Sequence, residues 1–285
     1  KGATDVDVVV LLKQVPDPKE YVRIREDGTL DREKARSIIN PCDRSALGAA
    51  IDAKEKYGAK ITAISMGPPK AEDALREALA MGVDEAILIS DRKLRGSDTL
   101  ATSYVLQRAI RKSGRHDLIL CGVETTDGGT GQVGPEVAEH LGIPQITCVE
   151  EFMIEGDFIE AKRTLEDKYE RLKVRLPALL TISNGAYLPR NTTFSGIMKA
   201  ERGQVQTWST AFIEADDDKV GSAGSPTRIM KVERVTFHRG HCAIVGADVD
   251  AVTANLLDKL AEDGISLVGH GDERRTGRNL GLCRA

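Results

Sequence analysis

The sequence lacks the features that would place it among nucleic-acid-binding or membrane-spanning proteins. Aromatic residues make up only 4% of the 285 residues, and the formal net charge is −4. Few aromatic rings leave little surface for base stacking, and a mildly acidic chain has no net attraction to phosphate backbones. No apolar run approaches the roughly 18 residues of a transmembrane helix. We therefore expect no nucleic-acid partner and no membrane insertion.

Paired cysteine motifs are also missing. The five cysteines are widely spaced and form no C-x-x-C pair, which is typical of a reducing compartment and gives no cysteine-based metal site. The segment His238-Arg-Gly-His241-Cys242 has no fourth ligand nearby, so we assign no metal there. The first residues lead into an apolar run instead of resembling a signal peptide, and we expect a cytoplasmic protein.

Residues 6–150 show short apolar runs that alternate with helical patterns. The apolar runs are Val6–Leu12, Ile61–Ser65, Ala86–Ile89, Leu118–Cys121 and Ile146–Val149. The helical patterns are Asp43–Tyr57, Lys70–Met81, Thr99–Lys112 and Gln132–Leu141. Continuously apolar strands that alternate with helices predict a parallel sheet covered on both faces. Asp43 and Asp98 stand at expected N-cap positions, and the expected helix stops are Gly58, Gly82 and Gly142.

The second half of the chain has a different pattern. Phe152–Glu160 and Lys168–Ile182 alternate polar and apolar residues, which predicts antiparallel strands at the sheet edge. We interpret Asn184–Phe194 and Gly203–Pro226 as irregular, and Asp248–Leu260 as an amphipathic helix. The fold class predicted is α/β, a doubly wound and mostly parallel sheet with an added antiparallel edge. The predicted domain covers 6–230, followed by a C-terminal arm at 231–268 and a disordered tail at 269–285.

The segment Asp127–Gly134 is the strongest candidate for a ligand site. It follows the apolar run Asp117–Gly122 and leads into a predicted helix, and such folds bind ligands beyond the carboxyl ends of their strands. Small residues leave backbone N–H groups accessible to a phosphate, and the helix N-terminus adds positive potential. The segment matches neither the Rossmann fingerprint nor the Walker loop, and it contains no Lys or Arg. It is therefore either a phosphate cradle of amides and the Thr130 hydroxyl or an ordinary turn.

Several motifs together resemble the β subunit of electron-transfer flavoproteins. They are Lys13-Gln-Val-Pro-Asp17, Ile39-Asn-Pro41, Met66-Gly-Pro-Pro69, Ala78-Leu-Ala-Met-Gly82, Thr126-Asp127, Gln132-Val-Gly-Pro135, Pro189-Arg190 and Gly196-Ile-Met-Lys-Ala200. The resemblance covers about residues 6–230. It implies a sheet of the adenine-nucleotide α-hydrolase type and a heterodimer with an α subunit.

The family contains two kinds of β subunit. Ordinary members hold AMP as a structural ligand, whereas electron-bifurcating members hold FAD, which takes a hydride from NADH. Its electrons then go to a low-potential acceptor, ferredoxin or flavodoxin, and to the FAD of the α subunit. This chain is similar to the bifurcating group at Asp91–Ser103 and Gly221–Thr227. The resemblance therefore implies FAD, with AMP as the alternative.

A physical argument also favours FAD over AMP. The pyrophosphate and ribityl chain of FAD need a second group of hydrogen-bond donors, and the predicted helix start at Asp98 offers hydroxyls and N–H groups. The chain departs from the bifurcating pattern at Val123, Glu124 and Gly129, where a basic residue, a glutamine and a carboxylate are usual. That departure removes charges from the phosphate loop but not its amides.

The resemblance assigns cofactor-binding roles to three groups of residues. The adenosine end would be held by Lys13, Asn40, Asp43, Ser65, Met66 and Gly67. The ribityl chain and one phosphate would be held by Asp98, Thr99, Thr102 and Ser103. The pyrophosphate would be held by Asp127, Thr130, Gly131, Gln132, Val133 and Gly134. Asn40 and Asp43 can equally be helix caps, and Met66 can be core packing.

No side chain is assigned a catalytic role, because the flavin carries the redox chemistry in this family. Arg92 and Arg95 are the basic residues nominated to face the flavin, with a solvated surface as an equal alternative.

The loop 184–200 matches the segment with which the family grips partner dehydrogenases of the acyl-CoA dehydrogenase type. Phe194 would be its apolar anchor and Lys199 would lie near an acidic partner surface, although Phe194 could instead pack under its own loop. The helix Asp248–Leu260 could embrace the α subunit. A universal-stress-type nucleotide-binding protein or an ATP pyrophosphatase also fits a parallel sheet. The former would not need the 184–200 loop, and the latter would carry a Ser-Gly-Gly motif where this chain has Lys13–Pro16.

Overall fold

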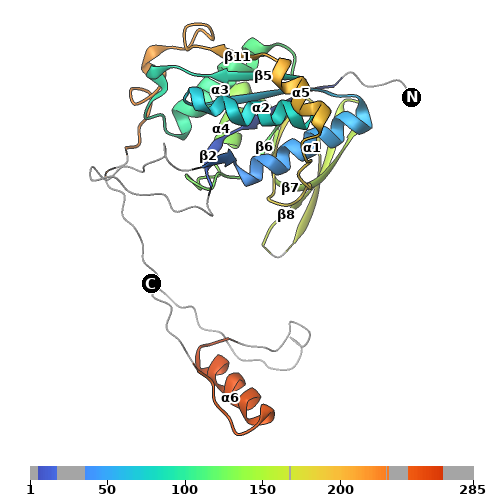
Figure 1. Ribbon diagram of the computed structural model, residues 1–285, viewed down its shortest axis with the longest axis vertical. Coiled ribbons are helices and arrows are strands. Elements are labelled where there is room, and N and C mark those ends of the chain that lie inside the picture. Colours follow the sequence, from blue (N-terminus) through green and yellow to red (C-terminus); the bar gives the residue numbers. More distant parts are fainter. Residues whose placement is uncertain (1–5, 18–35, 167, 229, 231–242, 266–285) are drawn as a thin grey trace. The chain divides into compact units, whose positions relative to one another are not determined.

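A nine-stranded, mostly parallel sheet forms the centre of the structure (Figure 1). The structure is a computed structural model that describes residues 6–17, 36–166, 168–228, 230 and 243–265. The chain divides into two compact units, Lys1–Val232 and Glu233–Ala285, and the sheet belongs to the first. Within the described residues, no helix is both long and apolar enough to cross a membrane.

The strand order explains where a site can form. The sheet runs β11-β5-β4-β1-β6-β10-β7-β8-β9. Its strands are β1 (Asp7–Leu12), β4 (Lys60–Met66), β5 (Glu85–Ile89), β6 (Leu118–Gly122), β7 (Gln145–Glu155), β8 (Phe158–Thr164), β9 (Tyr169–Arg175), β10 (Ala178–Ile182) and β11 (Val205–Trp208). From β1 the chain moves first to β4 on one side and later to β6 on the other. The β1–β6 pair is therefore the point where strand order reverses.

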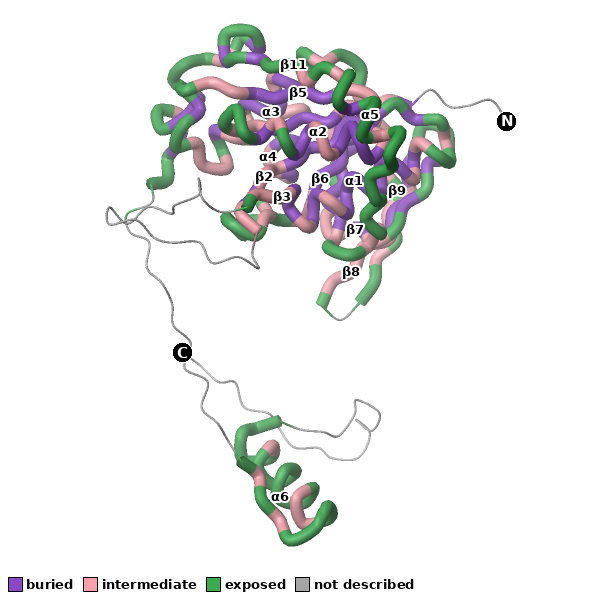
Figure 2. The backbone as a smooth tube through the Cα atoms, in the orientation of Figure 1, coloured by how far each residue is buried: buried purple, intermediate pink, exposed green. Residues whose placement is uncertain are grey.

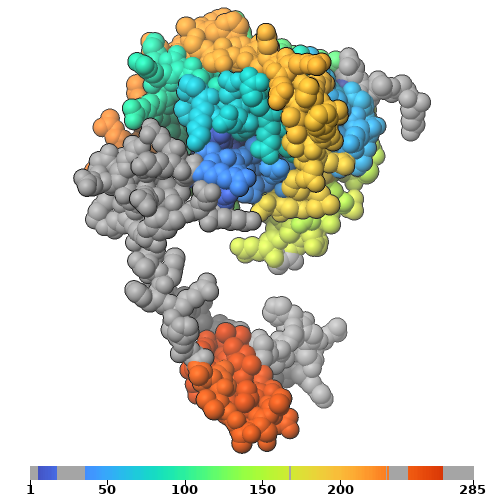
Figure 3. Space-filling view, viewed as in Figure 1, coloured from blue at the N-terminus to red at the C-terminus, as the bar shows by residue number. Residues whose placement is uncertain are grey.

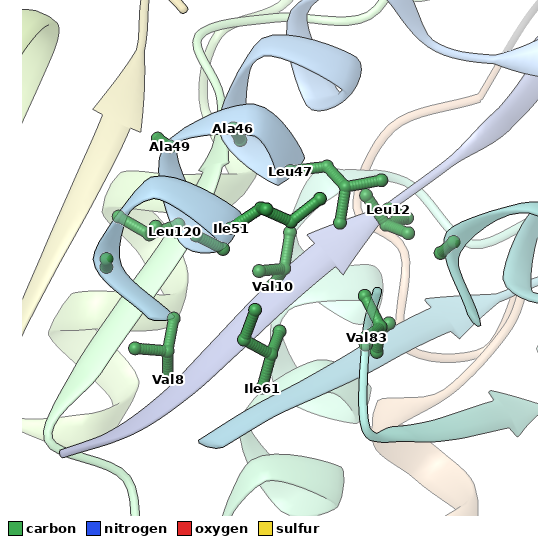
Figure 4. Close-up of a cluster of buried hydrophobic side chains, with 14 of the residues drawn as sticks. Val8, Val10, Leu12, Ala46, Leu47, Ala49, Ile51, Ile61, Val83 and Leu120 are labelled. Carbon is green, nitrogen blue, oxygen red and sulfur yellow. The ribbon is translucent and has the colours of Figure 1, made fainter. Parts of the chain in front are cut away.

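Helices cover both faces of the sheet, as a doubly wound fold requires. Val8, Val10 and Leu12 of β1 pack into one core with α1 (Pro41–Tyr57) and α2 (Glu72–Met81) (Figure 4). The alternate residues Val9 and Leu11 pack into a second core with α3 (Thr99–Ser113) and α4 (Val133–Leu141). Figure 2 shows the central strands as the buried part of the chain. The predicted fold class is confirmed, as are the expected helix stops at Gly58, Gly82 and Gly142.

The structure corrects the prediction for Lys168–Ile182. Only its first part, β9, is antiparallel and half-exposed, whereas β10 is a fully buried strand that pairs in parallel with β6 and β7. The physical reason is composition, because Ala178–Ile182 is continuously apolar except for Thr181 and so fits a strand covered on both faces. The predicted antiparallel edge consists of β7, β8 and β9.

The predicted loop at 184–200 and the segment Gly203–Pro226, predicted to be irregular, are both partly ordered. Phe194–Arg202 forms α5, which packs against α2, and Val205–Trp208 forms β11 beside β5. In addition, β2 (Gln14–Pro16) pairs antiparallel with β3 (Ser37–Ile39) in a small separate sheet. Each of these elements is short and contains a single buried residue, so the pattern of core-facing positions gives little indication of them.

The second unit contains α6 (Val249–Glu262), close to the predicted helix Asp248–Leu260. The Asp248 side chain caps it by accepting the Ala251 N–H at 2.9 Å. No residue of α6 is buried, and Leu256 and Leu257 are exposed. The His238–Cys242 segment and the predicted tail at 269–285 lie outside the described residues.

The packing of α4 on the sheet predicts a strong effect of a small substitution. A Cβ added at Gly134 would lie 2.8 Å from both Cys121 Sγ and Thr181 Cγ2. We expect Gly134→Ala to lower the free energy of unfolding by about 1–3 kcal/mol through overpacking, measured by urea denaturation. Gly128→Ala is the matched control, since its nearest atom is Thr125 Oγ1 at 3.4 Å. Equal unfolding midpoints for the two variants would contradict this packing.

Candidate functional site

The first turn of α1 binds the ends of both strands at the switch point. The Asp43 carboxylate accepts the Lys13 N–H at 2.8 Å through Oδ2 and the Gly122 N–H at 3.0 Å through Oδ1. Lys13 directly follows β1, and Gly122 ends β6. Asp43 is only 5% exposed. The side chain is therefore a bridge between two strand ends, and the prediction that it caps α1 is wrong, since the N-cap residue is Asn40.

Asn40 fixes the start of the loop that follows β6. Its Nδ2 donates to the Glu124 carbonyl at 2.8 Å, and its Oδ1 accepts the Thr126 N–H at 3.1 Å. Its backbone N–H donates to the Lys13 carbonyl at 2.9 Å. The Asn40 side chain makes no capping hydrogen bond to α1, because both of its polar atoms hold the loop. Fully buried, it sets the position of residues 124–126.

The outer half of this loop presents backbone donors. Gly129 and Gly131 have φ values of +59° and +64°, a region that L side chains rarely adopt. Within the described residues, no hydrogen bond reaches the N–H groups of Thr130 through Gly134. Thr130 is exposed, and α4 begins at Val133 without a side-chain cap. Unpaired N–H groups next to a helix N-terminus can bind an anion.

A basic side chain reaches the loop from another strand. Lys13 Nζ lies 2.7 Å from Asp127 Oδ1, although the two residues are 114 positions apart in sequence. The loop contains no Lys or Arg of its own. The structure thus brings together Lys13 and Asp127, which the sequence assigned to different parts of the site.

The starts of α3 and α4 also meet. Thr99 Oγ1 lies 3.2 Å from Gln132 Oε1 and 3.1 Å from Glu136 Oε1, so its hydroxyl can donate to either. Thr99 belongs to the predicted ribityl group of residues and Gln132 to the predicted pyrophosphate group. The structure therefore places the two groups side by side.

Three of the predicted residues have structural contacts instead of open surface. Ser103 is fully buried and donates to the Leu100 carbonyl at 2.9 Å, and Gly134, in the first turn of α4, is buried against the sheet. Asp98 caps α3, as predicted, by accepting the Ala101 N–H at 3.1 Å. It also accepts the Thr227 N–H and hydroxyl at 3.1 and 2.8 Å. Burial opposes ionisation of Asp98, but the hydrogen bonds from Ala101 and Thr227 outweigh it and hold its pKa below the usual value.

The end of β4 contributes a polar atom without a partner. Ser65 pairs with Leu12 of β1 in the sheet register and is fully buried. Its hydroxyl oxygen has no hydrogen-bond partner within the described residues. Met66 and Gly67 follow it and are partly exposed, as is Thr102 near the start of α3. An unpaired polar atom in a protein interior calls for an explanation.

The remaining predicted residues lie on the surface. Arg92 and Arg95 are exposed after β5. Phe194 is the first residue of α5 and is 83% exposed, so it does not pack under its own loop. Lys199 is exposed on the same helix. Within the described residues, no cluster of three or more potential metal ligands occurs.

Fold and site together define a doubly wound α/β protein with an open, glycine-rich loop at its switch point. The electron transfer flavoprotein domain family matches residues 27–212 of the chain. The chain therefore belongs to the electron transfer flavoprotein family, and several of its relatives are named electron transfer flavoprotein subunit beta.

The chain is 44% identical over 258 residues to an electron transfer flavoprotein subunit beta of Clostridium acetobutylicum, covering 90% of this chain and 99% of the relative. It is 40% identical over 262 residues to the acryloyl-CoA reductase electron transfer subunit gamma of Anaerotignum propionicum, covering 90% and 98%. It is 39% identical over 259 residues to the caffeyl-CoA reductase-Etf complex subunit CarD of Acetobacterium woodii, covering 90% and 99%. This membership replaces the alternative of a universal-stress-type protein.

The buried Asp43 predicts an unusual pH dependence of stability. Burial raises its pKa to about 7, against the hydrogen bonds from Lys13 and Gly122 that lower it. Between pH 4 and 7 the folded protein keeps a proton that the unfolded chain has lost. The free energy of unfolding should therefore fall as pH rises, by up to about 1.4 kcal/mol per pH unit, and level off above pH 7.

The measurement is the difference in unfolding free energy between the wild type and Asp43→Asn from pH 4 to 9. Asparagine cannot titrate, so the difference isolates the Asp43 contribution from all other groups. A difference that is constant with pH, or that grows in favour of the wild type between pH 4 and 7, would refute a raised pKa.

Proposed function

We propose that this chain is the β subunit of a heterodimeric electron-transfer flavoprotein and that it binds FAD at the β1–β6 switch point. The proposal rests on the contact between Thr99 and Gln132. This contact brings the donors at the start of α3 next to those of the loop before α4, at one edge of the sheet. A single phosphate needs only one such group, whereas a pyrophosphate with a ribityl chain needs both.

The residues present fit such a ligand. The unpaired N–H groups of Thr130 through Gly134 would hold the pyrophosphate, with the Thr130 hydroxyl beside them. Thr99 and Thr102 would serve the ribityl chain, and Ser65 and Met66 would line the adenosine end. Asn40 and Asp43 would not contact the ligand. They would fix the backbone of Lys13 and of residues 122–126, which surrounds it. Asp98 and Ser103 would hold α3 in place instead of contacting the ligand.

When bound, FAD supplies the hydride acceptor for NADH and the electron donor to a low-potential ferredoxin or flavodoxin and to the FAD of the α subunit. The chain itself would position that cofactor and supply charge around it. Lys13 brings a positive charge to the loop, and the exposed Arg92 and Arg95 are the basic residues on the β5–α3 connection. Relatives named as subunits of acryloyl-CoA and caffeyl-CoA reductase complexes favour this role over simple electron transfer.

AMP as a purely structural ligand is the second candidate, and a specific observation favours it. Asp98 and Ser103 are occupied by internal hydrogen bonds, which reduces the second group of donors to Thr99, Thr102 and the first N–H groups of α3. Val123, Glu124 and Gly129 also leave the loop without the charged residues expected for a bifurcating member. In this case the chain would be a scaffold that docks dehydrogenases.

The proposed partner surface lies on α5. Phe194, Ile197 and Met198 are all exposed and spaced so that they share one face of the helix, with Lys199 beside them. We propose that this face binds a flavin dehydrogenase of the acyl-CoA dehydrogenase type. The apolar residues Leu256 and Leu257 of α6 would contact the α subunit in a cytoplasmic complex.

The nucleotide content of the complex tests the cofactor. The chain is co-expressed with its α subunit, the purified heterodimer is denatured, and released nucleotides are separated and quantified. We expect two FAD and no AMP per heterodimer. One FAD with one AMP would overturn the FAD proposal and favour the scaffold.

Docking is tested separately with Phe194→Ala. Removing an exposed aromatic anchor should weaken binding of the acyl-CoA dehydrogenase-type partner more than tenfold, because such residues dominate interface energies. Phe212→Ala is the matched control, since Phe212 is half-exposed but stacks on Trp208. Equal affinities of the two variants would exclude α5 as the docking helix.

A further inference from the structure

The segment 184–193, which we call the display segment, links β10 to α5 and carries a very exposed side chain. Leu188 is 84% exposed, and the segment leads directly into Phe194. Figure 3 shows residues 184–202 as a ridge on the surface of the first unit. Within the described residues, positions 187–192 make no backbone–backbone hydrogen bond. Regular structure therefore does not hold this backbone in place.

One face of α1 supports the display segment instead. Ser45, Gly48, Asp52 and Glu55 follow a spacing of three or four residues, which places them on one side of the helix. Ser45 Oγ accepts the Gly185 N–H at 2.9 Å. A Cβ at Gly48 would lie 2.9 Å from the Leu188 carbonyl oxygen, so glycine permits the close approach. The start of the segment thus lies against the helix.

Arg190 attaches the far end of the segment to the same face. Its Nη2 lies 2.8 Å from Asp52 Oδ1 and 2.7 Å from Glu55 Oε2. Beyond it, Thr193 caps α5 by accepting the Gly196 N–H at 3.0 Å, and Arg76 of α2 donates to the Ala200 carbonyl at 3.3 Å. Between the Gly48 contact and the α5 cap, Arg190 is therefore the polar attachment that the described residues provide.

We propose that Arg190 is a positioning residue that clamps the display segment to α1 and so fixes Leu188 relative to Phe194 for docking. The inference rests on the proposed dehydrogenase docking. Exposed ion pairs contribute little to global stability, so the effect of this clamp is local. A segment without backbone hydrogen bonds would otherwise have to be ordered when the partner binds, and that ordering opposes binding. The clamp removes this penalty in advance.

Swapping the charges of Arg190 and of its partners on α1 distinguishes two explanations. In one, Arg190 clamps the display segment, and in the other it contacts the partner directly. The variants are Arg190→Glu, the pair Asp52→Arg with Glu55→Gln, and all three changes together. The wild type and each variant are prepared as the heterodimer with the α subunit. Arg175→Glu is the matched control, because Arg175 is an exposed arginine on β9 whose Nη2 lies 4.0 Å from the Asp157 carboxylate.

Three quantities are measured. Backbone NMR order parameters of residues 187, 188 and 190–192 are measured in the heterodimer without the dehydrogenase, the dissociation constant is measured for the acyl-CoA dehydrogenase-type partner, and nucleotide content is determined. We expect Arg190→Glu and the α1 pair each to lower these order parameters and to raise the dissociation constant about tenfold. The triple variant should restore both, and nucleotide content should not change.

Several outcomes would overturn the clamp. Weaker docking in Arg190→Glu without an effect of the α1 pair, or without rescue in the triple variant, would mean that Arg190 contacts the partner directly. Lower order parameters with unchanged affinity would remove its role in docking. Absence of binding by the wild type itself would show that the proposed docking function fails, and the docking role of Arg190 with it.

Discussion

The bridge from α1 to the ends of β1 and β6 is the interaction on which the candidate site depends. Parallel strands end with backbone groups that have no further ladder partner, and buried groups of this kind must be satisfied. Asp43 accepts the N–H groups of Lys13 and Gly122, while Asn40 holds the backbone of residues 124–126. The inner half of the loop is thereby fixed, and its unpaired N–H groups lie in the outer half. Without this bridge, the outer half of the loop would lose the support that positions its N–H groups.

Much of the fold could be predicted from hydrophobic patterning alone. The strands β1, β4, β5 and β6 are continuously apolar and lie close to where the sequence placed them. The sequence does not reveal the central position of β10, because only two residues separate its five residues from the alternating strand β9 and the two strands resemble one alternating segment. The helix α5 has signals in the sequence, since Thr193 is a good N-cap residue and Phe194, Ile197 and Met198 follow a helical spacing. It is only nine residues long, however, and it lies in a segment that matches a loop of the family.

The sequence predicts which residues lie near the candidate site, but not which of them contact one another. Residues after β1, β4 and β6 do converge, since the carboxyl ends of parallel strands share an edge. The Lys13–Asp127 ion pair could not be predicted, because it requires β1 and β6 to be neighbours, and alternation of strands and helices does not specify their order. The burial of Ser103 follows likewise from the packing of α3, which sequence spacing alone does not determine.

The helix α1 contacts both the candidate site and the display segment. Its first turn carries Asn40 and Asp43, and its outer face carries Asp52 and Glu55. Its inner face, with Ala46, Leu47 and Ala50 fully buried, is packed against the central strands (Figure 4). Close-packed interiors resist displacement, so the helix cannot shift at one end alone. The display segment and the candidate loop are thus both attached to α1, which suits a subunit proposed to pass electrons between a bound flavin and a docked partner.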